Sequence, residues 1–202
     1  TGLTPRGVTE DFNTRTARSL YGASKLASEM ICQEYAFTYG SKILINRCGV
    51  IAGAGQFGKV DQGVFTLWVA NHVFQKPLRY SGFGGQGKQV RDLLHPEDLY
   101  ELIHKQMQSD LGFDASIFNV GGGNSGSTSL LELTKICQEV TGQRVDITSQ
   151  PETAAVDIPY YVTDTSHVKQ AFNWQPKRSV PAIVSDIYNW IEKNKSTLQH
   201  IF

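Results

Sequence analysis

The sequence has no excess of charge of either sign and no long apolar run. Its 202 residues include 19 Lys plus Arg and 19 Asp plus Glu. Because no basic stripe stands out either, binding to nucleic acid or to an acidic membrane surface is not expected. The longest apolar stretch is broken by Asn71 and His72, and no signal peptide is visible. No membrane span is therefore predicted, and a cytoplasmic location is expected.

Cysteine is scarce, and neither the cysteines nor the histidines have the spacing of a metal site. Cys32, Cys48 and Cys137 are far apart and form no CxxC pair. Isolated thiols suit a reducing compartment, and all three are predicted to be buried. The five histidines show no pattern such as HExxH. No metal site is therefore expected.

Helix-like and strand-like segments alternate along the chain. Apolar residues recur at steps of three and four between Ser19 and Tyr39, which predicts a helix. A buried strand is predicted in KILINRCGVIA, residues 42–52. Later elements are predicted in this order: a helix over 64–74, a strand and turn over 77–85, an extended segment over 88–94, a helix over 96–108, a strand over 116–120, a helix over 129–141, a strand near 145, and helices over 165–172 and after 181. This alternation is typical of an α/β fold.

The segment GAGQFG, residues 53–58, matches the letters of the GxGxxG dinucleotide fingerprint. That fingerprint also requires a helix at the third glycine and an acid about 20 residues further on. Here residues 59–63 precede the helix, and no Asp or Glu lies between Asp61 and Asp92. Arg79 could serve a 2′-phosphate, but no second fingerprint element accompanies it. A plain strand-to-helix loop and a loop that lines a substrate cleft are the alternatives.

Tyr21 and Lys25 form the only YxxxK pattern in the chain. On a helix the two residues lie one turn apart on the same face. An ammonium group beside a phenol stabilises the phenolate, which makes the phenol a usable acid or base at neutral pH. The same ammonium can donate hydrogen bonds to ribose hydroxyls. An ordinary surface pair is the alternative for these two residues taken alone.

Several segments occur in the order found in one enzyme family. They are SLYGASKLASE, NRCGVIAG, GKQVRDLLHPEDL, FNVGGG with SLLEL, DIPYYVTD and NWQPKRS. Together they resemble the extended short-chain dehydrogenase/reductase family of NAD-dependent nucleotide-sugar epimerases and dehydratases. Within it, QFGKVDQGV and GKQVRDLLH are most similar to the CDP-paratose/CDP-tyvelose 2-epimerases.

The resemblance implies roles for particular residues. Tyr21 matches the catalytic tyrosine, and Lys25 matches the lysine that binds the cofactor ribose. Cys48 and Gly49 match strand-end positions whose backbone lies against the nicotinamide of NAD. Arg91 matches an arginine that grips the diphosphate of the substrate, for which its planar fork is well suited. The other implied substrate-binding residues are Val50, Gln56, Phe57, Gly63, Val64 and Asp157.

Some of these residues also have structural explanations. Arg91 could instead pair with Asp92 or Glu97. His95 is expected to fix the turn before the helix over 96–108, and Asp98 to interact favourably with the dipole of that helix. The large aromatic side chains expected in the core are Trp68, Phe74 and Trp174.

The chain departs from the family in two ways. The cofactor fingerprint and the catalytic Ser or Thr of the family lie well upstream of the tyrosine, and only twenty residues precede Tyr21. We therefore expect the C-terminal portion of a Rossmann-type enzyme. Residues 1–55 would hold the last helix and strand of the parallel sheet. Residues 56–202 would form a smaller mixed α/β substrate-binding lobe, with 88–120 partly returning to the sheet. In addition, Ala154 stands where many relatives have a phosphate-binding arginine.

The function implied is that of an NAD-dependent nucleotide-sugar epimerase acting on a CDP-linked sugar, dimeric at full length and inactive as this portion alone. A dehydratase or decarboxylase of the same family is one alternative. A non-catalytic domain that binds a nucleotide or a protein partner is the other.

Overall fold

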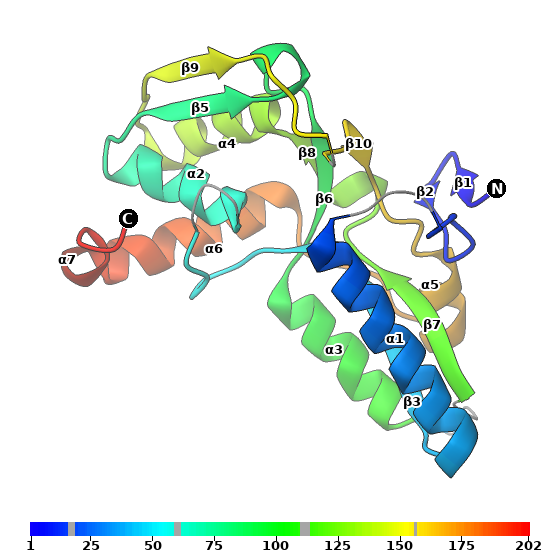
Figure 1. Ribbon diagram of the computed structural model, residues 1–202. Helices are drawn as coiled ribbons and strands as arrows, with labels where there is room; N and C mark the ends of the chain where they lie inside the picture. Colours follow the sequence, from blue (N-terminus) through cyan, green and yellow to red (C-terminus); the bar gives the residue numbers. More distant parts are fainter. Residues whose placement is uncertain (16–18, 59–61, 110–113, 156) are drawn as a thin grey trace.

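The chain folds into two adjoining groups of helices and strands, which β6 joins (Figure 1). The computed structural model describes residues 1–15, 19–58, 62–109, 114–155 and 157–202. The first group consists of α1 (Leu20–Tyr39), β3 (Ile43–Cys48), α3 (Pro96–Met107), β7 (Asp114–Val120) and α5 (Ser166–Phe172). The second group consists of α2 (Val64–Val73), β5 (Leu78–Ser81), α4 (Leu130–Thr141), β9 (Ile147–Gln150), α6 (Val180–Lys193) and α7 (Lys195–Leu198).

Short strands surround β6 (Val90–Leu94) at the centre of the molecule. β4 (Val50–Ile51) and β10 (Tyr160–Tyr161) pair with it in parallel, and β8 (Ser127–Ser129) pairs with it antiparallel. A small hairpin of β1 (Leu3–Thr4) and β2 (Gly7–Val8) lies near the N-terminus. The elements alternate and most strand pairs are parallel, so the predicted α/β class is confirmed.

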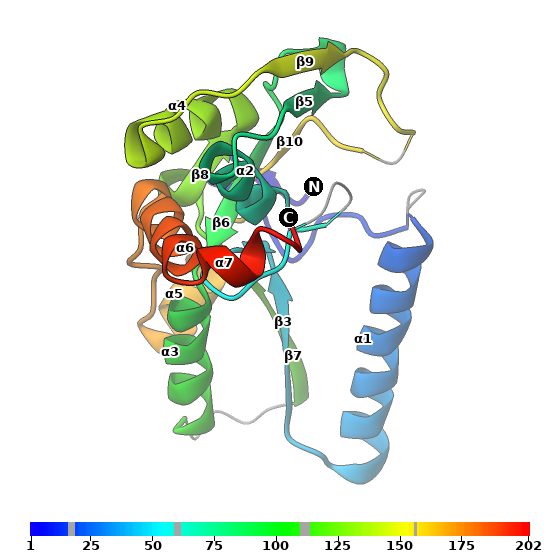
Figure 2. The ribbon, with the colours of Figure 1, turned by 90° about the vertical axis from the view of Figure 1, so that its left-hand side faces the viewer.

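The first group is built on the parallel pair of β3 and β7. Figure 2 shows α1 and α3 on opposite sides of this pair. On the side of α3, a hydrophobic cluster contains Leu94, Leu102, Phe118 and Trp174. α1 begins after Ser19, whose hydroxyl accepts the Gly22 amide, and ends at Gly40 in the left-handed conformation, as its sequence predicts.

The prediction that β3 is buried was wrong. Its side chains are half-buried, and Cys48 at its end is exposed. Among the described residues, β3 pairs only with β7, so its other edge has no strand beside it. An apolar strand can be fully buried only when neighbours cover both its edges and its faces.

The prediction of three buried thiols was therefore correct for one. Cys137 is buried in the second core, and burial raises the pKa of its thiol to about 12. Cys32 on α1 is half-buried and Cys48 is exposed. Both lie on the elements that surround the open edge of β3.

The second group has its own hydrophobic core between α2, α4 and α6. Val69, Leu133, Ile183 and Ile187 are fully buried there. Trp68 is buried in the same core and Phe74 packs against it, while Trp174 is buried in the first group. The predicted core aromatics are thus confirmed. Among the described residues, no helix is long and apolar enough to cross a membrane.

His95 and Asp98 fix the start of α3. The Nδ1 atom of His95 accepts the Glu97 amide at 3.2 Å, so its predicted structural role is confirmed. Asp98 does more than interact with the helix dipole. It is buried, its Oδ1 accepts Nη1 of Arg178 at 2.6 Å, and its Oδ2 accepts the amides of Lys177 and Arg178. Asp98 therefore anchors the segment that leads into α6.

The capping box of α4 gives a prediction about pH and stability. Ser129 and Glu132 exchange hydrogen bonds, which lower the pKa of Glu132 from its ordinary value of 4.5. A carboxylate with a lowered folded-state pKa stabilises the fold above its ordinary pKa, and this contribution is lost as the pH falls through the folded value. We expect Glu132→Gln to lower the free energy of unfolding by about 0.5 kcal/mol at pH 7 and by much less at pH 3.

Urea unfolding at the two pH values measures this difference. Glu139→Gln, on an exposed position near the end of the same helix, is the matched control and should change little at either pH. An equal loss at pH 7 and pH 3 for Glu132→Gln would contradict the role given to its charge.

Candidate functional site

A cleft of about 1000 Å³ opens beside β5, β6 and the start of α2. Five of the residues predicted to bind substrate line it, namely Val50, Gly63, Val64, Arg91 and Asp157. Its walls also contain Arg79, which the sequence considered only for a cofactor 2′-phosphate, and Lys76 and Gln150, which the sequence did not single out. The cleft thus brings together predicted residues that are up to about a hundred positions apart in the sequence, from Val50 to Asp157.

Arg91 and Asp157 contact each other at this cleft. Nη2 of Arg91 lies 2.9 Å from Oδ1 of Asp157 and donates to the carbonyl of Ile158 at 2.8 Å. The structural alternative for Arg91 named the wrong partners, because the ion pair is made with Asp157, whereas Asp92 is buried and Glu97 pairs with Arg178. The guanidinium is thus oriented by a partly exposed carboxylate, which an incoming anion could replace.

Asp92, the next residue on β6, lies where the ends of β3 and β7 meet β6. It is fully buried, and its Oδ2 accepts the Gly123 amide at 3.0 Å. Its Oδ1 has no hydrogen-bond partner among the residues that the structure describes. Burial raises the pKa of the Asp92 carboxyl, because the charged form loses its hydration.

Glycines make room for this carboxyl group. A Cβ atom on Gly121 would lie 2.3 Å from Oδ2 of Asp92, and one on Gly49 would lie 3.2 Å from Oδ1. Gly49 follows β3 and Gly121 follows β7, so both strands end with bare backbone beside Asp92. Gly49 is one of the two positions that the resemblance places against the nicotinamide.

Tyr21 and Lys25 lie together on the first turns of α1. Nζ of Lys25 is 5.5 Å from the centre of the Tyr21 ring, so the pair has the geometry that its spacing predicts. Both side chains are exposed. α1 runs down one face of the β3–β7 pair and β3 runs back, so the start of α1 and the end of β3, which Cys48 forms, lie at the same end of the pair (Figures 1 and 2). None of these four residues lines the cleft, so the predicted site residues form two neighbouring groups.

The GAGQFG loop is explained by packing. Gly58 is pressed against the start of α2, where an added Cβ would lie 2.5 Å from the Gly63 carbonyl oxygen and from the Leu67 amide nitrogen. The helix begins after Gly63, which has a φ of 74°. The helix thus does not begin at Gly58, the third glycine of the apparent fingerprint. This confirms the prediction that residues 59–63 separate that glycine from the helix. Residues 59–61 of this loop lie outside the described residues.

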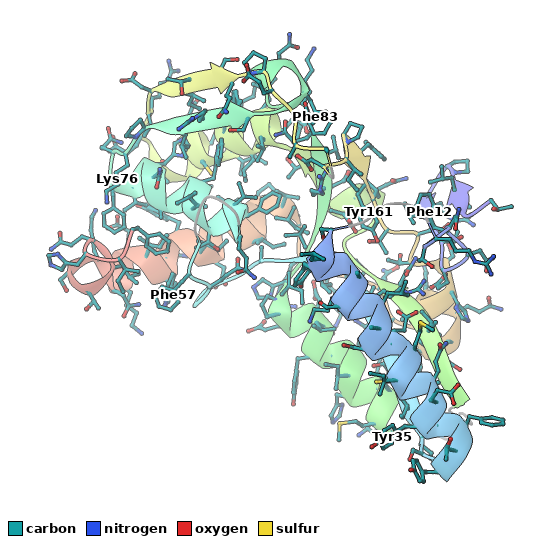
Figure 3. The ribbon with its side chains drawn as sticks, in the orientation of Figure 1. Phe12, Tyr35, Phe57, Lys76, Phe83 and Tyr161 are labelled. Carbon is teal, nitrogen blue, oxygen red and sulfur yellow. The ribbon has the colours of Figure 1, made fainter. Side chains whose placement is uncertain are left out.

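Gln56 and Phe57 in this loop make contacts within the protein. Gln56 donates to the Ile51 carbonyl at 3.1 Å and accepts from the Thr66 hydroxyl at 2.9 Å. Phe57 packs against Trp190 and Phe202, and Figure 3 shows it beside α6, away from Tyr161 at the centre of the molecule. Neither residue lines the cleft, whereas Gly63 and Val64 just after the loop do.

Arg79 and Gln150 line the cleft, although the sequence did not predict either of them as a substrate-binding residue. They lie on β5 and β9, which pair in parallel with Arg79 opposite Thr148 and Ser81 opposite Gln150. The alternation in LRYS was a usable signal, because Leu78 is buried in the core and Arg79 is exposed. Their meeting across two strands could not be derived from either strand alone.

The fold and the site define a Rossmann-type α/β protein of the extended short-chain dehydrogenase/reductase class. The model of the NAD dependent epimerase/dehydratase family matches residues 3–121, more than half of the chain. The chain belongs to that family.

Known relatives agree on the family and differ in their reactions. CDP-paratose 2-epimerase of Salmonella typhi is 32% identical over 178 residues, which cover 85% of this chain and 51% of that protein. UDP-glucuronic acid decarboxylase 1 of Arabidopsis thaliana is 31% identical over 180 residues, covering 86% of this chain and 39% of that protein. The chain thus spans about half the length, or less, of these relatives.

Solved structures show the same fold. The UDP-glucuronic acid 4-epimerase of Bacillus cereus, in complex with UDP-glucuronic acid and NAD, superposes with a TM-score of 0.81 at 21% identity. The match covers 96% of this chain and 58% of that one. Such coverage is consistent with a C-terminal portion of the enzyme fold.

Proposed function

We propose that the full-length protein is an NAD-dependent nucleotide-sugar epimerase that acts on a CDP-linked sugar. The observation that carries this proposal is the position of Arg91 and Asp157, which face a cleft large enough for a sugar nucleotide. A guanidinium that one carboxylate holds in place can exchange that carboxylate for a diphosphate. The similarity to the Salmonella enzyme supports the choice of reaction and of nucleotide.

The residues near the end of β3 suit the nicotinamide half of NAD. Tyr21 and Lys25 offer a phenol and an ammonium on one helix face, and Gly49 offers backbone with no side chain. NAD, when bound, would supply the acceptor and later the donor of a hydride. Lys25 would hold the ribose hydroxyls, with Cys48 and Gly49 contacting the ring through their backbone.

In this mechanism Tyr21 exchanges a proton with the sugar. Its phenolate accepts the proton of the sugar hydroxyl as that carbon is oxidised, and the phenol returns the proton when the ketone is reduced on its other face. Lys25 favours the phenolate by its charge. Arg91 and Asp157 would hold the nucleotide while the sugar turns between the two steps, and Val50, Gly63 and Val64 would line the space for it.

Product mass tests the reaction against its rivals in the family. We expect the full-length enzyme to convert a CDP-linked hexose into a product of the same mass and a different configuration, measured by mass spectrometry and NMR. Loss of water would indicate a dehydratase, and loss of carbon dioxide a decarboxylase. Nucleotide binding without turnover of any sugar nucleotide would favour a non-catalytic binding domain.

A homodimer of the full-length protein is also proposed. Met30, Ile31, Tyr35 and Phe37 on α1 are more than half exposed. An apolar helix surface of this kind is typical of a protein interface. The family resemblance supports pairing of these helices between two subunits.

Removing Arg91 should weaken the binding of any nucleoside diphosphate. A charge-assisted, two-pronged contact contributes about 1.5–3 kcal/mol, so Arg91→Ala is expected to raise the Kd for CDP by about 10- to 100-fold. Calorimetric titration measures it, with Lys177→Ala as the control, because Lys177 is exposed and pairs with Glu101 outside the cleft. An unchanged Kd in Arg91→Ala would refute the diphosphate contact.

A further inference from the structure

The cleft has a polar wall that the diphosphate contact does not use. Arg79 and Ser81 on β5, with Thr148 and Gln150 on β9, all line the cleft. Alternate residues of a strand point to opposite faces, and the residues between them point toward the core. Leu78 is buried, and Tyr80 contacts Thr134 of α4. The exposed face of this two-stranded ladder is therefore a row of hydrogen-bonding side chains.

Arg79 is held at the edge of this wall by a neutral partner. Its Nη1 donates to Oε1 of Gln150 at 2.9 Å, and Ser81 contacts the same oxygen at 3.5 Å. Among the described residues, no carboxylate pairs with Arg79. A guanidinium has five N–H donors. The hydrogen bond to Gln150 uses one of them, which leaves most of the guanidinium donors available to a ligand in the cleft.

Gln89 connects this wall to Arg91. Its Nε2 donates to the Ser81 carbonyl at 3.0 Å, and it lies two residues before Arg91 on the same side of the chain. Its Oε1 is buried and has no hydrogen-bond partner in the described part of the chain. Gln89 also lines the cleft, so the wall that holds Arg79 continues through it to the proposed diphosphate contact at Arg91.

We propose that Arg79 reads the base of the nucleotide and selects cytosine over uracil. This inference rests on the proposed function, because it takes Arg91 as the diphosphate contact and places the base on the neighbouring wall. Cytosine presents two adjacent acceptors, O2 and N3, which the two parallel N–H groups of a guanidinium can contact together. In uracil N3 carries a hydrogen, so the same fork meets a donor at that position.

The expected preference for cytosine arises because two hydrogen-bond donors, N3–H of uracil and an N–H group of Arg79, repel each other. Bidentate contacts of arginine to a pair of base acceptors discriminate against a wrong base by a factor of about 10 to 100. The bond from Gln150 orients the guanidinium before the ligand arrives, which reduces the conformational entropy lost on binding.

Calorimetric titration of this chain with CDP, UDP and GDP tests the inference. We expect the wild type to bind CDP about 10- to 100-fold more tightly than UDP. Arg79→Ala should lose most of the affinity for CDP and leave the Kd for UDP nearly unchanged, so that the preference disappears. Arg79 is exposed, and a thermal melt of the variant checks that its fold is retained.

Two further variants separate this inference from the proposed function. Lys76→Ala removes another cation that lines the cleft and should leave the preference for CDP intact. Arg91→Ala should weaken CDP and UDP by the same factor. Equal binding of CDP and UDP by the wild type, a preference that survives Arg79→Ala, or binding of GDP as tight as that of CDP would overturn the role of Arg79 alone. A wild type that binds no nucleoside diphosphate would overturn both proposals.

Discussion

Replacing Tyr21 by phenylalanine in the full-length enzyme is expected to lower kcat by about 10²- to 10⁴-fold, the usual contribution of a positioned acid or base. Phenylalanine keeps the ring beside Lys25 and removes only the hydroxyl that carries the proton. Because Arg91 and Asp157, which hold the nucleotide in the proposed mechanism, are unchanged, KM for the sugar nucleotide should change little. Steady-state kinetics with a CDP-linked hexose measures both constants.

Tyr39→Phe is a matched control for this variant. Tyr39 lies at the other end of α1, and its exposed fraction of 70% is close to the 68% of Tyr21. The same atom is removed from the same helix, at a position far along it from the YxxxK pair. An epimerisation rate unaffected by Tyr21→Phe would remove Tyr21 from the mechanism, whatever the control shows.

Replacing Asp98 by alanine is expected to reduce the free energy of unfolding of this chain by about 3 kcal/mol. Its carboxylate is 1% exposed and accepts hydrogen bonds from the backbone of Lys177 and Arg178 and from the Arg178 side chain. The substitution leaves two amides without their acceptor and Arg178 without its buried partner. The effect should be large because Asp98 is buried, whereas Glu97 and Glu101, which also pair with Arg178 and Lys177, are partly or mostly exposed.

Urea unfolding of Asp98→Ala and Glu97→Ala makes the comparison direct. Glu97 pairs with the same guanidinium of Arg178, but its side chain is 64% exposed. Exposed ion pairs contribute about 0.2–1 kcal/mol, so Glu97→Ala should cost less than about 1 kcal/mol. Equal losses for the two variants would mean that the charge of Arg178 matters and the burial of Asp98 does not.

Helices with explicit end signals were the most predictable part of the fold. Pro96 opens α3 and Ser129 opens α4, as their types predict. Gly40 and Gly142 end helices in the left-handed conformation. These signals depend on a few neighbouring residues, so the sequence carries them whatever the rest of the molecule does.

Strand burial and the shortest strands were less predictable. The sequence of β3 suits a buried strand, yet the strand is half-buried, because burial depends on what pairs with its second edge. In the part of the chain that the structure describes, β8 and β10 have three and two residues and pair only with β6. Pairs this short have no periodic pattern of their own, so tertiary contacts alone define them.

In the candidate site, too, local contacts could be predicted from the sequence and long-range contacts could not. The contact of Tyr21 with Lys25 follows from helix geometry and was predictable. Arg91 and Asp157 were expected from the family resemblance, but their direct pairing was not. Gly49 was expected beside the nicotinamide and Gly121 only as part of the FNVGGG segment, and the three-dimensional structure shows that both make room for the Asp92 carboxyl group.

The order of Arg91 and Asp92 along β6 has a mechanical consequence. Successive strand residues point to opposite faces, so Arg91 faces the cleft while Asp92 faces the junction of strand ends beside Gly49 and Gly121. Both residues belong to one strand that is hydrogen-bonded to β4, β8 and β10. A displacement of the backbone of β6 would therefore move the cation of the cleft and the buried carboxyl together.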